Sequence, residues 1–259
     1  MRKLGLSLVL LGAVAAMVAA TGTAGTSRST ATFKFCTNAT FPPMESKTSG
    51  GQTVGFDIDM ASALAKTWGD TAQPVETSFD GLIPSLNAKK CDAVISAIFV
   101  TPERTKVAGD VPYMQTHRVL IVRSGNPKGI KGPNDLKGKV VAVQSGTKYE
   151  EYLKGLAKKL GFTVQSYKGD NDAVAQILLG RADAVLTQDT SYSSQARQHP
   201  GKLGIGYTYK GFDSFGLYFR KADESALGQQ LKDGMAKLKS NGTLVTLAKK
   251  YKLPVNTVQ

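Results

Sequence analysis

The residues with the clearest chemical pattern are Thr101-Pro102-Glu103-Arg104, which directly follow an apolar, β-branched run. The threonine and the proline are typical of the N-cap and first position of a helix, and the glutamate suits the first turn. Arg104 does not suit the first turn, because it places a cation at the positive end of the helix dipole. A guanidinium beside free helix N–H groups can bind a carboxylate or a phosphate. The alternative is a salt bridge to a nearby acid, which is the preferred interpretation of this residue taken alone.

Other residue types that could bind a metal or a phosphate show no comparable spacing. His117 and His199 are not spaced for a metal site with each other or with the two cysteines, so we interpret both as structural. The segment 132–140 superficially resembles a phosphate loop, but it has one residue too many and ends in Val140 instead of Ser or Thr. The sequence therefore predicts neither a metal site nor a cofactor.

The elements that must position Arg104 follow the order β-α-β-α-β. Strands are expected at residues 33–36 and 75–77 and in the apolar run before Thr101, from hydrophobic runs of strand length. Asp57 and Asp80 are interpreted as N-caps of the two intervening helices. This order predicts parallel strands with covering helices.

The same pattern returns later in the chain. Strands are expected at residues 139–143 and 162–167, and the motif Asp183-Ala184-Val185 repeats Asp92-Ala93-Val94. Two similar α/β units that face each other predict a cleft at the ends of their strands. The stretches 113–122 and 210–219 are expected to cross between the units. The second crossing would return the helical tail, residues 220–259, to the first unit.

The N-terminus has the features of a secretory signal peptide. A basic pair precedes an apolar run at residues 4–18, which is short for a membrane span, and cleavage is expected after Ala20 or Ala24. We assign residues 1–24 to this peptide. Because no cysteine lies near either cleavage site, a lipoprotein is not expected, and the mature protein should be periplasmic or otherwise exported, and soluble.

The charge and the cysteines limit the possible partners. The net charge is +13, but the lysines are scattered and no aromatic-interleaved basic stripe is present. Attraction to an anionic membrane or cell wall is therefore favoured over nucleic-acid binding. Cys36 and Cys91 both occupy expected strand positions, so we expect two buried, reduced thiols. A disulfide, which export permits, is the alternative.

Several short motifs occur in a fixed order along the chain and together resemble the periplasmic polar-amino-acid-binding proteins of ABC importers, solute-binding protein family 3. The motifs are Phe41-Pro42-Pro43-Met44-Glu45, Val54-Gly55-Phe56-Asp57-Ile58-Asp59, Phe79-Asp80-Gly81-Leu82-Ile83-Pro84-Ser85-Leu86, Thr101-Pro102-Glu103-Arg104, Leu136-Lys137-Gly138-Lys139, Gln144-Ser145-Gly146-Thr147 and Asn241-Gly242-Thr243. The resemblance implies an α/β, two-lobe clamshell of type II. Lobe 1 would comprise residues 33–115 plus 216–259, and lobe 2 residues 116–215, joined by two crossover segments.

The resemblance also implies a ligand site between the lobes. The counterpart of Arg104 binds the ligand α-carboxylate, aided by the hydroxyl and amide of Thr147. An aromatic ring at the Phe41 position stacks on the ligand, and Ser96 and Ala97 offer oxygens to the α-ammonium. The complete set of ligand-binding residues that the resemblance implies is Asn38, Phe41, Phe79, Ser96, Ala97, Ile98, Phe99, Arg104, Gln144, Thr147, Lys148, Gln188 and Asp189.

The sequence departs from the family pattern at the site itself. Phe99 replaces a usual Ser or Thr, which makes the cleft more apolar, although this ring could also belong to the core. Gln188 stands where an ammonium-binding acid is usual, and Asp189 follows it, so either residue could meet the ammonium. Lys148 stands where small or polar residues are common. We interpret it as a solvated lysine at a helix start, with a contact to a second ligand carboxylate as the alternative.

The leading function that follows is a monomeric binding protein, without catalytic residues, that delivers an amino acid to a membrane-embedded ABC permease. The alternative is an exported enzyme resembling cyclohexadienyl dehydratase, which would need a cleft acid such as Glu150, Glu151 or Asp189. A subunit that presents its ligand to a signalling receptor would use the same cleft.

Overall fold

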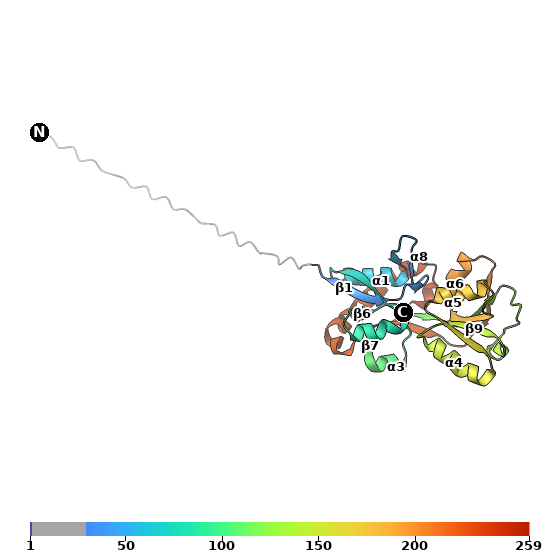
Figure 1. Ribbon diagram of the computed structural model, residues 1–259. Helices are drawn as coiled ribbons and strands as arrows, with labels where there is room; N and C mark the ends of the chain where they lie inside the picture. The colour runs from blue at the N-terminus through green and yellow to red at the C-terminus, as the bar shows by residue number, and fades with distance from the viewer. Residues whose placement is uncertain (2–29, 259) are drawn as a thin grey trace.

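The computed structural model describes residues 1 and 30–258, so residues 2–24 of the expected signal peptide lie outside the described residues. Figure 1 shows two α/β lobes side by side, each built on its own sheet. The two-lobe α/β clamshell expected from the sequence is therefore confirmed. Within the described part of the chain, no helix is both long enough and apolar enough to cross a bilayer.

The sheet of the first lobe has the order β5-β1-β6-β13-β7. Strand β1 pairs in parallel with both neighbours, whereas β13 pairs antiparallel with β6 and β7. The strands are β1 (Thr32–Thr37), β5 (Thr71–Glu76), β6 (Ala93–Val94), β7 (Ala108–Thr116) and β13 (Asp213–Arg220). The helices that precede β7 in the chain are α1 (Phe56–Lys66), α2 (Leu82–Asn87) and α3 (Pro102–Val107). A 3-10 turn at Phe79–Gly81 comes directly before α2.

The sheet of the second lobe has the order β10-β9-β11-β8-β12. Strand β9 pairs in parallel with β10 and β11, and β8 runs antiparallel to β11 and β12. The strands are β8 (Arg118–Arg123), β9 (Val140–Gln144), β10 (Thr163–Tyr167), β11 (Ala184–Gln188) and β12 (Leu203–Thr208), and the helices are α4 (Lys148–Leu160), α5 (Asp170–Leu178) and α6 (Asp189–Gln198), with a 3-10 turn at Pro133–Leu136. Neither β12 nor α6 was expected from the sequence.

Two segments join the lobes, at the β7–β8 and β12–β13 junctions. They lie next to each other, because the His117 side chain contacts the Gly211 carbonyl oxygen through Nδ1 at 2.8 Å. After β13 the chain forms α7 (Gln229–Ser240) and α8 (Thr243–Lys250), and both helices contact α1. The tail therefore packs on the first lobe. Short turns complete it at Lys221–Asp223, Glu224–Gly228 and Val255–Thr257.

A small third sheet covers one end of the first lobe, in a region where the sequence predicted only a loop. It consists of β2 (Thr40–Phe41), β3 (Glu45–Lys47) and β4 (Thr53–Val54), paired antiparallel. These strands are too short for an alternating hydrophobic pattern to reveal them. Strand β3 carries Glu45 into the protein interior, where it is 1% exposed.

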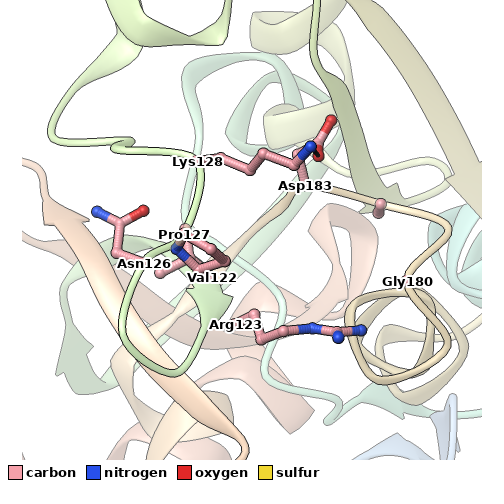
Figure 2. Close-up of a pocket in the computed structure, with 8 residues that line it drawn as sticks. Val122, Arg123, Asn126, Pro127, Lys128, Gly180 and Asp183 are labelled. Atoms are coloured by element: carbon pink, nitrogen blue, oxygen red, sulfur yellow. Dashed lines mark ion pairs between the residues drawn. The ribbon is translucent and has the colours of Figure 1, made fainter.

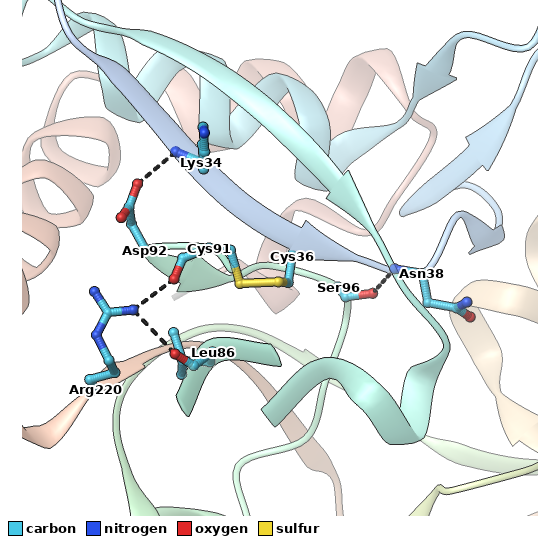
Figure 3. Close-up of a disulfide and its surroundings, with 8 residues drawn as sticks. All are labelled: Lys34, Cys36, Asn38, Leu86, Cys91, Asp92, Ser96 and Arg220. Atoms are coloured by element: carbon cyan, nitrogen blue, oxygen red, sulfur yellow. Dashed lines mark hydrogen bonds between the residues drawn. A yellow bond between two sulfur atoms is a disulfide. The ribbon is translucent and has the colours of Figure 1, made fainter. Parts of the chain in front are cut away.

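The two cysteines form a disulfide, so the expectation of free thiols was wrong. Cys36 on β1 and Cys91 just before β6 have Cα atoms 5.6 Å apart, and both are buried. The parallel pairing of β1 with β6 brings them within the usual bridging distance. In Figure 3, Arg220 of β13 lies beside the bridge and donates to the Cys91 carbonyl oxygen at 2.7 Å.

The helix N-caps are partly as expected. The Thr101 hydroxyl accepts a hydrogen bond from the Arg104 N–H at 3.3 Å, which confirms the predicted cap of α3. Asp57 is not the cap of α1, because Gly55 occupies that position and the Asp57 side chain is buried. Asp80 does not cap α2 either, because it lies in the preceding 3-10 turn and Gly81 precedes the helix.

Candidate ligand site between the lobes

The first-lobe wall of the site is formed at the carboxyl ends of two neighbouring parallel strands. Asn38 directly follows β1, and Ser96 and Ala97 lie just beyond β6. The Asn38 N–H donates to Ser96 Oγ at 2.9 Å, as Figure 3 shows. This edge of an open α/β sheet is where ligands commonly bind. The predicted grouping of these residues therefore agrees with the geometry.

Arg104 lies half-buried in the first turn of α3. Its Nη1 donates to the Phe99 carbonyl oxygen at 2.9 Å, and its guanidinium carbon lies 5.8 Å from the centroid of the Phe79 ring. Burial lowers the pKa of Arg104. Within residues 30–258, Arg104 forms no ion pair, so the structure does not contain the salt bridge that was the alternative interpretation.

Aromatic rings form a continuous layer that crosses from the first lobe to the second. Phe99 stacks on Phe215 with ring centroids 5.2 Å apart, and Phe41 meets Phe215 edge-on at 6.1 Å. Tyr149 of α4 reaches Phe99 from the second lobe at 5.0 Å. Phe99 and Tyr149 are 2% exposed, so the layer is closed to solvent. The side chain of Ile98 instead joins a separate apolar cluster with Cys36 and Cys91.

The second-lobe wall is the end of β9 and the start of α4. Gln144 Nε2 donates to Asn38 Oδ1 at 3.0 Å, which is a direct hydrogen bond between the lobes. The Thr147 hydroxyl caps α4, since it accepts from the Glu150 N–H at 3.1 Å and donates to the Gln144 carbonyl oxygen at 2.8 Å. What Thr147 offers a ligand is therefore the N-terminal end of α4, whose first amides have no partner within the helix.

Lys148 is not a solvated lysine, contrary to the preferred interpretation of the sequence. Its ammonium forms an ion pair with Asp213 of β13 and lies 4.5 Å from the centroid of the Phe99 ring. The Tyr149 hydroxyl donates to the same Asp213 carboxylate at 2.7 Å. Asp213 belongs to none of the sequence motifs, because it becomes part of the site only through the return of the chain in β13.

Gln188 and Asp189 lie at the junction of β11 and α6. The Gln188 side chain is 7% exposed, and its Oε1 lies 2.7 Å from the Thr187 hydroxyl oxygen. Asp189 Oδ1 accepts from the Thr116 hydroxyl at 2.6 Å, where β7 leaves the first lobe. Gln188 thus holds a buried amide, whereas Asp189 holds a carboxylate beside the segment that joins the lobes.

The lobes approach each other closely at Gly146. This residue has φ of +75°, and a Cβ atom built on it would lie 2.7 Å from the Cβ of Asp80 in the first lobe. A similar approach occurs at Gly169, whose Cβ would lie 2.8 Å from the Cβ of Thr40. These contacts, together with the Gln144–Asn38 hydrogen bond, show that the structure has the lobes closed on each other.

A cavity of about 190 Å³, shown in Figure 2, lies at the other end of the second sheet from Gln144 and Gln188. It opens between the end of β8 and the turn before β11, and none of the predicted ligand residues lines it. Its charged groups have partners within the chain, since Arg123 donates to the Ile177 carbonyl oxygen at 3.0 Å and Lys128 pairs with Asp183 at 3.8 Å. In the described residues, no cluster of three or more His, Cys, Asp or Glu side chains could hold a metal ion.

Comparison with known proteins places these features in a family. The model of the bacterial extracellular solute-binding proteins, family 3, matches residues 33–254. The L-cystine-binding protein TcyJ of Escherichia coli K12 is 32% identical over 214 residues, which cover 82% of this chain and 79% of that protein. The histidine-binding periplasmic protein of the same strain is 31% identical over 262 residues, which cover 97% of each chain.

Solved structures agree with this result. An ancestral arginine-binding protein bound to arginine superposes with a TM-score of 0.80 at 34% identity, covering 85% of this chain and 97% of that one. The ancestral amino acid-binding protein AncCDT-1, described as a precursor of cyclohexadienyl dehydratase, gives a TM-score of 0.78 at 32% identity and covers 85% and 95%. The chain therefore belongs to the bacterial extracellular solute-binding proteins of family 3, as the motifs of its sequence indicated.

Proposed function

We propose that this protein captures an amino acid between its lobes and delivers it to a membrane-embedded ABC import permease. The observation that carries the proposal is Arg104, a half-buried guanidinium at the start of α3 that has no carboxylate partner in the described chain. A buried charge without a counter-ion is costly. A ligand carboxylate that binds both guanidinium branches removes that cost.

The second lobe supplies the other half of the carboxylate site. The N-terminal end of α4 faces the first lobe near Gly146, so a ligand carboxylate held by Arg104 also meets helix amides when the lobes close. In the proposal the lobes move as rigid bodies about the joint between His117 and Gly211. Residues 33–115 plus 216–259 form one body, and residues 116–215 form the other. Closure of two lobes around a ligand is the usual motion of this architecture.

The names of the relatives support an amino acid as the ligand, since they bind cystine, histidine and arginine. In this chain the α-ammonium would lie between the turn at Ser96 and Ala97 and either Gln188 or Asp189. Phe41 and Phe79 would contact the ligand side chain. The Phe99 ring takes the place of a usual polar contact, so we expect the pocket to favour contact with apolar atoms of the ligand.

We further propose that the mature protein is exported to the periplasm without a lipid anchor and acts as a monomer without a cofactor. Delivery would then depend on the closed form, because only closure places surfaces of both lobes next to each other for the permease. The strongly positive net charge of the chain also favours attraction to an anionic membrane surface.

The test is a binding screen of the mature protein. Each standard L-amino acid and L-cystine is added, and the melting temperature is recorded, because a ligand that binds only the folded state raises it. Native mass spectrometry of the freshly purified protein checks for a retained small molecule. The proposal predicts a shift with at least one amino acid and micromolar or tighter affinity by calorimetric titration. No shift with any of them would refute it.

The second candidate, an enzyme, is kept because of the likeness to AncCDT-1. Two of its three candidate acids are poorly placed. Glu150 accepts from Gly146 N–H and pairs with Lys154, and its pKa is lowered by hydrogen bonds from Lys154 and Ser166 despite some burial, so it is a poor proton donor. Glu151 is exposed.

Asp189 is the remaining one of the three candidate acids for this alternative. Incubation of the protein with prephenate, followed by the absorbance of phenylpyruvate, tests it directly. The binding function predicts no turnover. Turnover that disappears in Asp189→Asn would establish the enzyme instead.

A further inference from the structure

Two carboxyl groups lie in the core of the first lobe directly behind Ser96 and Ala97. Glu45 of β3 is 1% exposed and Asp57 of α1 is 0% exposed. The Ser96 hydroxyl donates to Glu45 Oε1 at 3.0 Å, and the Ala97 N–H donates to Asp57 Oδ2 at 2.6 Å. Each carboxyl group therefore holds one of the two residues that are placed beside the ligand ammonium.

One oxygen of this pair lacks a donor. Glu45 Oε2 is buried and has no hydrogen-bond partner in the described chain, whereas both oxygens of Asp57 accept from the Tyr113 hydroxyl at 2.8 Å. An unpaired buried carboxylate oxygen is costly. A proton on Glu45 Oε2 removes the charge, and the interaction of Glu45 with Asp57 favours a proton on Glu45. The unpaired oxygen of Glu45 and the donors that face Asp57 thus fit one proton on the pair, carried by Glu45.

The surroundings of the pair favour that proton. Burial, and then the charge of Asp57, raise the pKa of Glu45 well above its usual value. Burial also raises the pKa of Asp57 to about 6, against the lowering by hydrogen bonds from Ala97 and Tyr113. The other titratable groups that act on the pair are Tyr113 on β7 and Asp170 at the start of α5. These effects favour the proton on Glu45 and the charge on Asp57.

The charge on Asp57 supports an unusual backbone conformation. Ala97 has φ of +41°, in the left-handed region that is unfavourable for a residue with a Cβ. Its N–H meets a charged acceptor at a short distance, which makes the hydrogen bond stronger than one to a neutral group. When Asp57 takes up a proton, this bond weakens and Ala97 loses the acceptor that stabilises its conformation.

Building on the proposed function, we propose that Glu45 and Asp57 are positioning residues. With one proton on the pair, carried by Glu45, they hold Ser96 and Ala97 in place for the ligand ammonium, so that affinity falls when the pair takes up a second proton. The second proton goes to Asp57, which removes the negative charge behind the ammonium. Such linkage limits the fall to about tenfold per pH unit below the pKa. We therefore expect about tenfold weaker binding near pH 5 than at neutral pH, and release of protons on binding near pH 6.

The first test needs no ligand. The backbone amide signal of Ala97 is followed by NMR in the ligand-free protein between about pH 4.5 and about pH 8. It should move with a midpoint of about 6, because its acceptor is Asp57. The movement should vanish in Asp57→Asn. It should persist in Glu45→Gln, because the side-chain carboxamide of this variant is a neutral donor toward Asp57, as the protonated glutamate is. The Glu45→Gln variant also keeps the question open to experiment if Asp57→Asn does not fold.

The matched control is Asp170→Asn. Asp170 is also buried, and burial raises its pKa to about 6, but it accepts from the hydroxyls of Thr187 and Ser191 instead of from Ala97. The Ala97 amide should still titrate in this variant, because Asp170 acts on the pair through its charge on Glu45 and does not accept from Ala97. An amide that does not titrate in the wild type, or that stops titrating only in Asp170→Asn, would overturn the proposal.

The second test measures binding across the same pH range. L-arginine, L-histidine and L-cystine are titrated calorimetrically into the wild type, Asp57→Asn and Asp170→Asn, in two buffers with different heats of ionisation. The pH-dependent loss of affinity and the proton release should be absent only in Asp57→Asn. Affinity that is constant with pH in the wild type would refute the positioning role and leave the binding function intact. No binding at any pH would refute the binding function. In that case the NMR titration of the Ala97 amide still shows whether the pair holds its proton.

Discussion

Lys148 and Phe99 contact each other across the two lobes. The ammonium nitrogen of Lys148 lies 4.5 Å from the centroid of the Phe99 ring, and the same ammonium pairs with Asp213 where β13 leaves the joint. A cation over an aromatic face contributes about 0.5–2 kcal/mol, depending on how far it is desolvated. The contact therefore favours the closed arrangement even without a ligand.

Replacing Lys148 with Met should shift the ligand-free protein toward more open forms, because both its contact with Phe99 and its ion pair are lost. Small-angle X-ray scattering of the ligand-free variant should give a larger radius of gyration than that of the wild type. The matched control is Lys154→Met on the same helix, whose pair with Glu150 lies within α4 and whose side chain is 59% exposed. An unchanged radius in Lys148→Met would show that the contact does not hold the lobes.

Arg104→Met should weaken ligand binding and barely affect the ligand-free protein. Truncation of one partner of a desolvated charge pair costs about 2–5 kcal/mol, or roughly 30- to several-thousand-fold in affinity. The Phe99 carbonyl oxygen keeps a donor in the variant, the Tyr218 hydroxyl at 2.7 Å. Arg104→Lys should recover only part of the loss, since lysine lacks the planar fork.

Calorimetric titration with the amino acid that gives the largest melting shift, alongside ligand-free melting, checks both Arg104 variants. The opposite pattern, a lower ligand-free melting temperature with nearly unchanged affinity, would mean that Arg104 is structural.

Gly146→Ala should reduce affinity because the added methyl group meets Asp80 only when the lobes close. Gly161→Ala is the matched control. Gly161 has nearly the same φ, +74° against +75°, but a Cβ there has nothing within 4 Å. Both variants should lose stability by about 1–2 kcal/mol from the left-handed backbone. Only Gly146→Ala should lose affinity, by at least about tenfold. Equal affinities in the two variants would contradict the closed contact.

The double variant Cys36→Ala/Cys91→Ala should unfold more easily. The disulfide closes a loop with a sequence separation of 55, and its loss should lower the free energy of unfolding by about 4 kcal/mol through the entropy of the unfolded chain. Urea unfolding measures this. The intact mass of the non-reduced wild type should be two hydrogens below that of the reduced protein. A mass equal to that of the reduced form would mean that the bridge does not form.

Much of the fold could be predicted from local pattern. The strand at β1 and the helix α1 follow from hydrophobic period, which depends on neighbours in sequence. The errors concern contacts between distant segments. The disulfide depends on β1 lying beside β6, and the burial of Asp57 depends on β7 bringing Tyr113 over α1.

The candidate site shows the same division. Ser96 and Asn38 could be placed together because both follow parallel strands of one sheet. Lys148 was misjudged because its partner Asp213 arrives from a crossover far along the chain. Glu45 gave no signal of burial, since a glutamate in a proline-rich stretch is usually exposed.

The position of β13 in the first sheet has a consequence for the order in which the molecule can assemble. Strand β13 lies between β6 and β7 and is the only strand of that sheet that pairs with β7 in the described structure. The second sheet, by contrast, comes from one continuous stretch of chain, from Arg118 to Thr208. In a chain that emerges N-terminus first, the second lobe has all its strands before the first lobe can complete its sheet. A chain that stops short of β13 therefore carries Asn38, Ser96 and Ala97 on a sheet that lacks the strand between β6 and β7.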